Sequence, residues 1–283
     1  MARQRWEGGA GVLLGLLVLG VAGCANKAAR EPAAPESEQA AVKEVEKLGG
    51  HVWLHPSQPW PVKGVDLSRT EGTDAGLKEL KEIKSLRELR LKESKVTDAG
   101  LKELKELRSL QTLDLFGTGI TDAGLKELKE LKSLQTLYLD LTKVTDAGLK
   151  ELKELNNLKA LGLVGTNITD AGLKELKELK SLQALWLNDT RVEGPGLREL
   201  KELESLRALR LDGSKVTDAG PKELKEFKGL QTLGLSNTGI TDAGLQELKG
   251  LKSLRNLELK SSKVTDAGVN ELQTARPELR VSR

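Results

Sequence analysis

The stretch LQTLDLFGTGITDAGLKELKEL, residues 110–131, is one copy of a unit that fills most of this chain. Its TDAG tetrapeptide recurs at a step of 24 residues, beginning at Thr73, Thr97, Thr121, Thr145, Thr169, Thr217, Thr241 and Thr265. A ninth position, Glu193, keeps the register but reads EGPG. Nine units without an inserted or deleted residue are typical of a stacked repeat protein. Such proteins build extended binding surfaces, so the repeat favours recognition over catalysis.

The composition fits a thin core of identical layers. Of the 283 residues only 2% are aromatic, and leucine carries most of the apolar content, which suits an elongated core better than a bulky one. The 45 basic and 42 acidic residues are interleaved and give a formal net charge of +3. This surface offers no broad basic field, so we expect no nucleic-acid partner.

Each unit predicts a short strand followed by a short helix. In the quoted copy Leu113 and Leu115 alternate with outward residues, which is the pattern of a strand with one buried face. Leucines then recur every three residues and share one helix face, at Leu125, Leu128 and Leu131. Parallel strands stacked about 4.8 Å apart would form the inner surface of a curved α/β solenoid.

The turn between strand and helix carries three structural predictions. Thr121 or Asp122 is expected to cap the helix. A hydroxyl that is expected to satisfy buried backbone groups recurs at Thr70, Ser94, Thr118, Thr142, Thr166, Thr190, Ser214, Thr238 and Ser262. The glycine of TDAG costs about 1 kcal/mol in a helix, so its recurrence predicts that neighbouring backbones approach too closely there for a side chain.

Two units depart from the repeat pattern. Glu193–Gly196 loses the Thr-Asp pair and Pro221 replaces an inward leucine, so the sixth and seventh units are predicted to be the least regular. Pro277 is expected to end the last helix. The sequence after it predicts a strand stub and no substantial C-terminal cap.

The pattern LxxLxLxxTx[VI], repeated from about Val65 to Val281, resembles the leucine-rich-repeat family, and its turn is most similar to bacterial VTDAGL-type repeat proteins. The resemblance implies a curved solenoid with parallel strands on the concave face and short helices on the convex face. We therefore assign residues 65–283 to nine repeats and a terminal strand stub.

Residues 39–64 are predicted to form an N-terminal cap, because the first repeat would otherwise expose a hydrophobic side. Apolar residues at helical spacing precede Gly49-Gly50, and a short strand is expected near His51–Leu54. Trp53 and Trp60 are expected to pack within this cap rather than to stack on a ligand.

The first 23 residues predict an export signal. The apolar run from about Ala10 to Ala22 is shorter than the ~20 residues of a transmembrane helix and fits a signal peptide. The junction Val21-Ala22-Gly23-Cys24 resembles the lipobox of bacterial lipoproteins, which implies cleavage before Cys24 and lipid attachment to its thiol. The alternative is an ordinary signal peptide with an incidental cysteine. Under the lipoprotein interpretation, residues 24–38 are the lipidated cysteine and a flexible tether.

The outward strand positions vary from unit to unit, whereas helices and turns are near copies. Two outward columns hold the candidate partner-binding residues, which are Asp114, Phe116, Tyr138, Asp140, Gly162, Trp186, Asn188, Arg210 and Asp212. Tyr138 and Trp186 are two strands apart, about 10 Å by the strand spacing, with small residues between them. The sequence predicts a shallow trough with aromatic walls, and Tyr, Trp and Arg dominate binding hot spots.

Other chemistry is not indicated. His51 and His55 are the only histidines, and no third metal ligand accompanies them. The Thr-Asp pair recurs eight times, whereas catalysis needs one unique constellation. We expect no enzyme activity, no metal and no cofactor.

The favoured function is a membrane-anchored, extracytoplasmic interaction module that binds a partner protein or peptide on its concave face. The expected location is the cell envelope, on the periplasmic or outer-membrane side, with the lipidated N-terminus in the membrane. Two alternatives remain open: a structural envelope spacer or surface component, and a glycan-binding lipoprotein.

Overall fold

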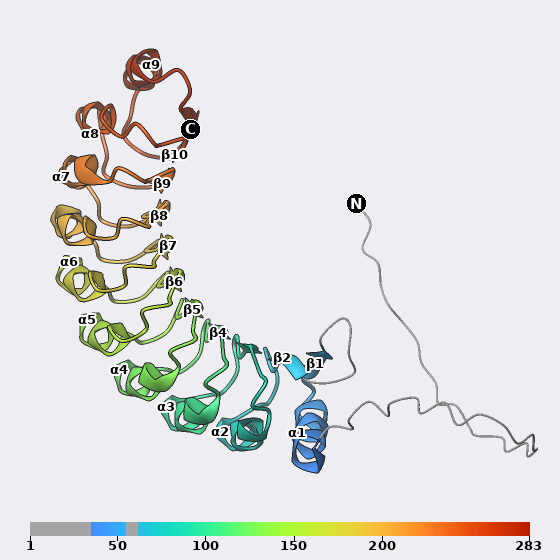
Figure 1. The fold of residues 1–283 in the computed structure, drawn as a ribbon. Helices are drawn as coiled ribbons and strands as arrows, with labels where there is room; N and C mark the ends of the chain where they lie inside the picture. The colour runs from blue at the N-terminus through green and yellow to red at the C-terminus, as the bar shows by residue number, and fades with distance from the viewer. Residues whose placement is uncertain (1–34, 55–61) are drawn as a thin grey trace, which may run out of the picture. The chain divides into compact units, whose positions relative to one another are not determined.

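The computed structural model describes residues 35–54 and 62–283, and residues 34–283 form one compact unit. Among the described residues, the strands pair in chain order in a single sheet of 11 strands. Figure 1 shows the strands along the inner side of the array and the helices along its outer side. The α/β solenoid predicted from the period is therefore confirmed.

The first strand is antiparallel to the second, and every later pair is parallel. The strands are β1 (His51–Leu54), β2 (Val62–Asp66), β3 (Glu88–Arg90), β4 (Thr112–Asp114), β5 (Thr136–Tyr138), β6 (Ala160–Gly162), β7 (Ala184–Trp186), β8 (Ala208–Arg210), β9 (Thr232–Gly234), β10 (Asn256–Glu258) and β11 (Arg280–Ser282). Equivalent residues of successive units are register partners, as with Leu113 and Leu137. In β3 to β10 the central residue is a buried leucine and its neighbours face the concave side.

The α-helices of the repeats are short. The α-helices are α1 (Glu36–Lys47), α2 (Asp74–Leu77), α3 (Asp98–Leu101), α4 (Asp122–Leu125), α5 (Asp146–Leu149), α6 (Asp170–Leu173), α7 (Ala219–Glu223), α8 (Asp242–Leu248) and α9 (Asp266–Ala275). The 3₁₀ helices are η1 (Lys78–Glu82), η2 (Lys102–Glu106), η3 (Lys126–Glu130), η4 (Lys150–Leu152), η5 (Lys174–Leu176), η6 (Pro195–Leu200) and η7 (Leu224–Glu226). Residues three apart lie in line in a 3₁₀ helix. The three-residue spacing of the leucines, which predicted a helix, therefore also explains why each α-helical turn continues as a 3₁₀ helix.

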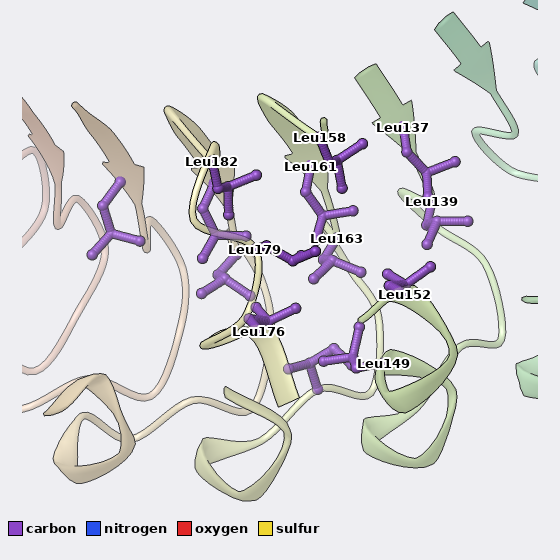
Figure 2. Close-up of a cluster of buried hydrophobic side chains, with 14 of the residues drawn as sticks. Leu137, Leu139, Leu149, Leu152, Leu158, Leu161, Leu163, Leu176, Leu179 and Leu182 are labelled. Carbon is purple, nitrogen blue, oxygen red and sulfur yellow. The ribbon is translucent and has the colours of Figure 1, made fainter. Parts of the chain in front are cut away.

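The core is a stack of leucine layers. Figure 2 shows Leu137, Leu161 and Leu163 from the strand side, and Leu149 and Leu152 from the helix side, filling the space between strands and helices. All five are fully buried. Burying one such side chain stabilises the fold by roughly 1.5–3 kcal/mol. Because each layer contacts only its neighbours, these contributions add along the array.

The aspartate of TDAG links each unit to the next, while the threonine caps the helix. Thr121 Oγ1 accepts a hydrogen bond from the Ala123 N–H at 3.2 Å. Asp98 Oδ1 accepts from the Thr121 N–H at 2.8 Å, and Asp98 Oδ2 accepts from the Thr121 hydroxyl at 2.6 Å. We call this pair of bonds the clasp, and it joins Asp74–Thr97, Asp98–Thr121, Asp122–Thr145, Asp146–Thr169, Asp218–Thr241 and Asp242–Thr265.

The clasp also explains the glycine of TDAG and corrects one prediction. A Cβ on Gly148 would lie 2.3 Å from Asp122 Oδ1, and a Cβ on Gly124 would lie 2.3 Å from Asp98 Oδ1. A side chain is excluded at this position, as predicted. The excluding neighbour is the clasp carboxylate, however, and not the adjacent backbone.

The predicted role of the turn hydroxyls is confirmed. Thr118 Oγ1 donates to the Leu115 carbonyl at 2.7 Å, and Thr142 Oγ1 donates to the Leu139 carbonyl at 2.6 Å. The same bond recurs at all nine hydroxyl positions. Most of these carbonyls also accept a longer bond from the backbone N–H of the hydroxyl residue, as with the Thr118 N–H and the Leu115 carbonyl at 3.2 Å, so the hydroxyl supplies the shorter of two bonds at the turn.

The clasp is missing at two junctions, on either side of the sixth unit, where irregularity was predicted. Between the fifth and sixth units Asp170 accepts only from the N–H groups of Glu193 and Gly194, at 3.3 and 3.2 Å. Between the sixth and seventh units there is no clasp aspartate. Gly194 stands in the place of the clasp aspartate with a φ of +124°, and a Cβ there would lie 2.7 Å from Gly220 Cα. A backbone bond from the Thr217 N–H to the Glu193 carbonyl, 3.3 Å long, crosses the junction instead. The sixth unit contains the 3₁₀ helix η6 and no α-helical turn.

The N-terminal side of the first repeat is covered by α1 and by the β1–β2 hairpin. α1 begins at Glu36, within the residues that the sequence assigned to the tether, and it buries Ala41 and Val45. Leu48 packs against Gly76, where a Cβ would lie 2.6 Å from Leu48 Cδ1. Trp53 lies against Gly64. His55 and Trp60 lie outside the described residues.

The expectation of no substantial C-terminal cap is wrong. α9 ends at Ala275 ahead of Pro277, as predicted, and β11 adds a further parallel strand. The Arg276 side chain is only 6% exposed, and its guanidinium donates to the carbonyls of Lys252 and Leu254 at 3.0 and 3.1 Å. It therefore satisfies backbone groups that no further unit covers. None of the helices in residues 35–54 and 62–283 combines the length and apolar character needed to cross a bilayer.

Candidate functional site

The sheet register brings the nine predicted residues together on the concave face of β4 to β8. The middle column is a run of register partners, namely Asp114, Tyr138, Gly162, Trp186 and Arg210. The adjacent column, two residues further along each unit, contains Phe116, Asp140, Asn188 and Asp212. These residues fall into an aromatic pair, a paired charged group and a cation–aromatic contact.

The aromatic pair closes the trough that the sequence predicted. The ring centroids of Tyr138 and Trp186 are 6.0 Å apart and the ring planes are inclined by 37°. Gly162 lies between their strands and has no side chain to separate them. The sequence predicted a shallow trough about 10 Å across between these side chains, whereas their ring centroids are only 6.0 Å apart, so the two rings form a tilted contact across the strand of Gly162.

A carboxylate lies over this glycine. Asp140 Oδ1 accepts a hydrogen bond from the Val164 N–H at 2.8 Å, and a Cβ on Gly162 would lie 2.4 Å from Asp140 Oδ2. Asp212 makes the same two contacts at β9. It accepts a hydrogen bond from the Ser236 N–H, and its other oxygen lies over Gly234. An aspartate in one unit therefore requires a glycine in the next.

Arg210, Asp212 and Asn188 form an internally paired group. Arg210 crosses Gly234 and forms an ion pair with Glu258, and its Nη1 lies 3.6 Å from Asp212 Oδ2. Asn188 Nδ2 donates to the same Asp212 oxygen at 3.2 Å. Asn188 Oδ1 is a buried acceptor without a hydrogen bond in the part of the chain that the structure describes.

Phe116 is covered by a cation and not by another ring. Lys92 Nζ lies 4.3 Å from the Phe116 ring centroid, within the range of a cation–π interaction. The Phe116 N–H donates to Asp114 Oδ1 at 3.0 Å. Phe116 thus flanks the Tyr138–Trp186 pair and has its own partner.

Sequence reasoning missed Leu141, which directly follows Asp140. Its side chain is 53% exposed, more than any other large hydrophobic side chain in the described residues. Its φ of +54° lies in the left-handed region, which costs a residue with a Cβ about 1–2 kcal/mol. The equivalent left-handed positions are Arg69, Glu93, Gly117, Gly165, Asp189, Gly213, Asn237 and Ser261. A comparison of this third column would have found Leu141, because it is the apolar exception there.

The electrostatics around the aromatic pair are negative. Partial burial raises the pKa of the Tyr138 hydroxyl, and the charges of Asp114, Asp140 and Glu88 raise it further. Burial also raises the pKa of Asp140, with Asp114 adding to the effect and the bond from the Val164 N–H opposing it. Tyr138 is therefore a neutral donor at physiological pH, surrounded by carboxylates.

Within residues 35–54 and 62–283, no three His, Cys, Asp or Glu side chains gather closely enough to hold a metal ion. His51 lies in β1 rather than in a helix, as expected. Cys24 lies outside the described residues.

The comparisons with known proteins agree with this architecture. The family model described as leucine-rich repeat matches residues 106–129 and 154–177. The crystal structure of internalin C2 from Listeria monocytogenes has a TM-score of 0.57 at 23% identity, over 87% of this chain and 92% of that one. The internalin inlF of the same species has a TM-score of 0.50 at 18% identity, over 72% and 69%. The two matched units are similar to leucine-rich repeats, and the fold of the chain is that of a leucine-rich-repeat solenoid.

A plant receptor shares the fold over part of its length. The leucine-rich-repeat ectodomain of the Arabidopsis thaliana receptor kinase GASSHO1/SCHENGEN3, solved in complex with CASPARIAN STRIP INTEGRITY FACTOR 2, has a TM-score of 0.56 at 21% identity. The match covers 81% of this chain and 27% of that one. At such identities the likeness concerns the fold alone. No curated protein sequence matches this chain significantly.

Proposed function

We propose that this chain is a membrane-anchored, non-enzymatic interaction module that binds a partner protein or peptide on its concave face, centred on β4 to β7. The observation that carries the proposal is the Tyr138–Trp186 pair above Gly162, with the exposed Leu141 in the same repeat as Tyr138. Half-buried aromatic side chains beside an exposed aliphatic one, on an otherwise polar face, are typical of interaction sites.

The cost of this surface favours binding over a passive spacer. Leu141 adopts a left-handed backbone that glycine occupies in three equivalent units. Asp140 is buried and has no ion-pair partner among the described residues. A spacer would need neither feature, since both reduce stability without adding to the stacked core.

The experiment is a crosslinking pull-down from the native host with the full-length chain and a Tyr138→Ala/Trp186→Ala double variant. The same column already holds Gly162 and Gly234 in intact strands, so the double variant should remain folded. Glu258→Ala, in the same column but away from the pair, is the matched control. Partners captured by the wild type and the control, and lost with the double variant, are expected. Equal capture by all three proteins would reject the concave-face site.

The membrane anchor is proposed from the sequence alone, through the lipobox-like junction at Cys24. Two or more acyl chains hold a protein stably on a bilayer, because each buried methylene contributes about 0.8 kcal/mol. A Cys24→Ala variant should therefore leave the membrane fraction and should not incorporate labelled palmitate. Wild-type protein that carries no lipid would refute the anchor and leave the binding proposal standing.

A further inference from the structure

Two carboxylates beside the aromatic pair have no cationic partner. Six carboxylates lie in strands β2 to β10 or in the column that contains Phe116 and Asp140. Four of them pair with arginines: Asp66 and Glu88 with Arg90, and Asp212 and Glu258 with Arg210. The other two, Asp114 and Asp140, form no ion pair with any residue that the structure describes. The unpaired carboxylates are also the two that flank Tyr138.

Asp140 presents a carboxylate oxygen without a counter-charge over the strand between the two rings. The residue is 7% exposed, its Oδ1 accepts from the Val164 N–H, and its Oδ2 has no ion-pair partner within the described residues. That oxygen lies over Gly162, the residue between the strands of Tyr138 and Trp186. Burying an ionised carboxylate without a counter-charge is costly, so the arrangement is poised to gain from a cation.

A comparable group of an aromatic ring and two carboxylates lies at β1 to β3, and there a cation is present. The Arg90 guanidinium lies 5.1 Å from the Trp53 ring centroid. It forms an ion pair with Glu88 at 2.6 Å, and its Nη1 lies 4.0 Å from Asp66. An arginine thus occupies a position between an aromatic ring and two carboxylates. Asp114, Asp140, Tyr138 and Trp186 supply the rings and the carboxylates, but no arginine of the described residues forms an ion pair with these carboxylates or a cation–π contact with these rings.

We propose that Asp114, Tyr138, Asp140 and Trp186 form a subsite for a basic side chain of the partner, with arginine preferred over lysine. This inference rests on the proposed function and names the chemistry of its ligand. A guanidinium is planar, stacks on aromatic rings and donates to two carboxylates at once, whereas an ammonium is a compact point charge. A neutral sugar or an acidic peptide would leave both carboxylates unpaired. Leu141 provides an apolar contact beside the charged group.

The test is a selection of short random peptides from a display library against the immobilised full-length chain. The selection is repeated on three variants, Asp140→Asn, Asp212→Asn and Trp186→Ala. Asp140→Asn removes the charge and keeps an oxygen for the Val164 N–H. Asp212→Asn is the matched control, because Asp212 has the equivalent backbone bond and glycine contact but already pairs with Arg210. Affinities of selected peptides are then measured by fluorescence anisotropy, with citrulline, the uncharged analogue, replacing arginine in a second series.

The expected result is that wild type and Asp212→Asn select peptides rich in arginine. Asp140→Asn and the citrulline peptides should each weaken binding about tenfold or more, as expected for a lost hydrogen-bonded charge pair. Peptides that bind at Trp186 without a basic preference would overturn the cation subsite and keep the proposed function. The absence of any peptide sensitive to Trp186→Ala would count against both.

Discussion

The aspartates of the turns and those of the concave face are the same side chain in two opposite environments. Asp242, a clasp aspartate, accepts hydrogen bonds from the Thr265 hydroxyl and N–H, and these bonds lower its pKa. Asp140 accepts one backbone bond, lies buried beside Asp114, and has its pKa raised by that burial. Asp242 therefore stabilises the stack in its charged form, whereas the charge of Asp140 opposes folding.

The difference separates structure from function in a chain of near-identical units. The clasp recurs along the array, and it is lost only at the two junctions of the sixth unit, which is the least regular. The unpaired carboxylates occur once, next to the aromatic pair and the strained Leu141. Features that reduce stability at one place on a regular scaffold indicate a site maintained for binding.

The largest effect should follow from breaking one clasp in the middle of the array. Asp122→Ala removes both hydrogen bonds to Thr145 and leaves its N–H without the carboxylate. We expect a loss of about 2–3 kcal/mol in the free energy of unfolding, measured by urea denaturation followed by circular dichroism. Peptide or partner binding at Trp186 should be unchanged in the folded variant. A loss below about 0.5 kcal/mol would mean that the clasp contributes little.

The next effect comes from the glycine that receives the clasp carboxylate. Gly148→Ala places a methyl group where Asp122 Oδ1 lies, and overpacking of this kind costs about 1–3 kcal/mol. Gly250→Ala is the control, because no atom lies within 4 Å of a Cβ at that position. Thermal unfolding should show a lower Tm for the first variant only. Equal Tm values for the two variants would contradict the steric account of TDAG.

Removing the charge of Asp140 should stabilise the protein. The folded-state pKa of Asp140 lies above the unfolded value of about 3.9, so the native state binds more protons in that window and stability falls as the pH rises through it. Asp140→Asn should therefore raise the free energy of unfolding at pH 7, on the order of 1 kcal/mol. The gain should vanish in acid, below the unfolded pKa.

Asp242→Asn provides the opposite case for the same measurement. Its folded pKa is lowered, so its stabilisation is present above the unfolded pKa and is lost as the pH falls through the folded value. Urea denaturation across the acid range should show the Asp242 variant less stable than wild type at pH 7, with the difference closing in acid. Matching signs for the two variants would refute the comparison between turn and concave aspartates.

The smallest effect is expected at Leu141. Leu141→Gly relieves the left-handed strain, and glycine already occupies the equivalent positions 117, 165 and 213. Stability should rise by up to about 1 kcal/mol in urea denaturation, while binding at the aromatic pair weakens through the lost apolar contact. Leu185→Gly, in the buried core, serves as the contrast and should strongly destabilise. Unchanged binding by Leu141→Gly would remove this residue from the site.

Much of the fold could be predicted because its signal is repeated. The alternation of Leu113 and Leu115 indicated the strand, and the spacing of three leucines indicated the helix that tightens to 3₁₀ geometry. The candidate residues were also found from sequence, since comparison between units separates varying positions from fixed ones. Leu141 was missed because only two outward columns were compared.

Side-chain contacts between units could not be predicted in the same way. The sequence placed Tyr138 and Trp186 two strands apart, but side-chain direction decides that the rings meet over Gly162. It indicated that the TDAG glycine lacks space, but not that a carboxylate takes that space. Arg276 carried no sign of its capping role, because its partners are backbone carbonyls about 24 residues away.

By itself, the period of the sequence determined a stacked coil of leucine layers, because every unit repeats the same apolar pattern and each layer needs only its neighbours. The tertiary structure alone decided which charges are neutralised. Ion pairing depends on which side chains from different units reach one another, and that reach left Asp114 and Asp140 without a cation while Arg90 and Arg210 satisfied the rest of the face.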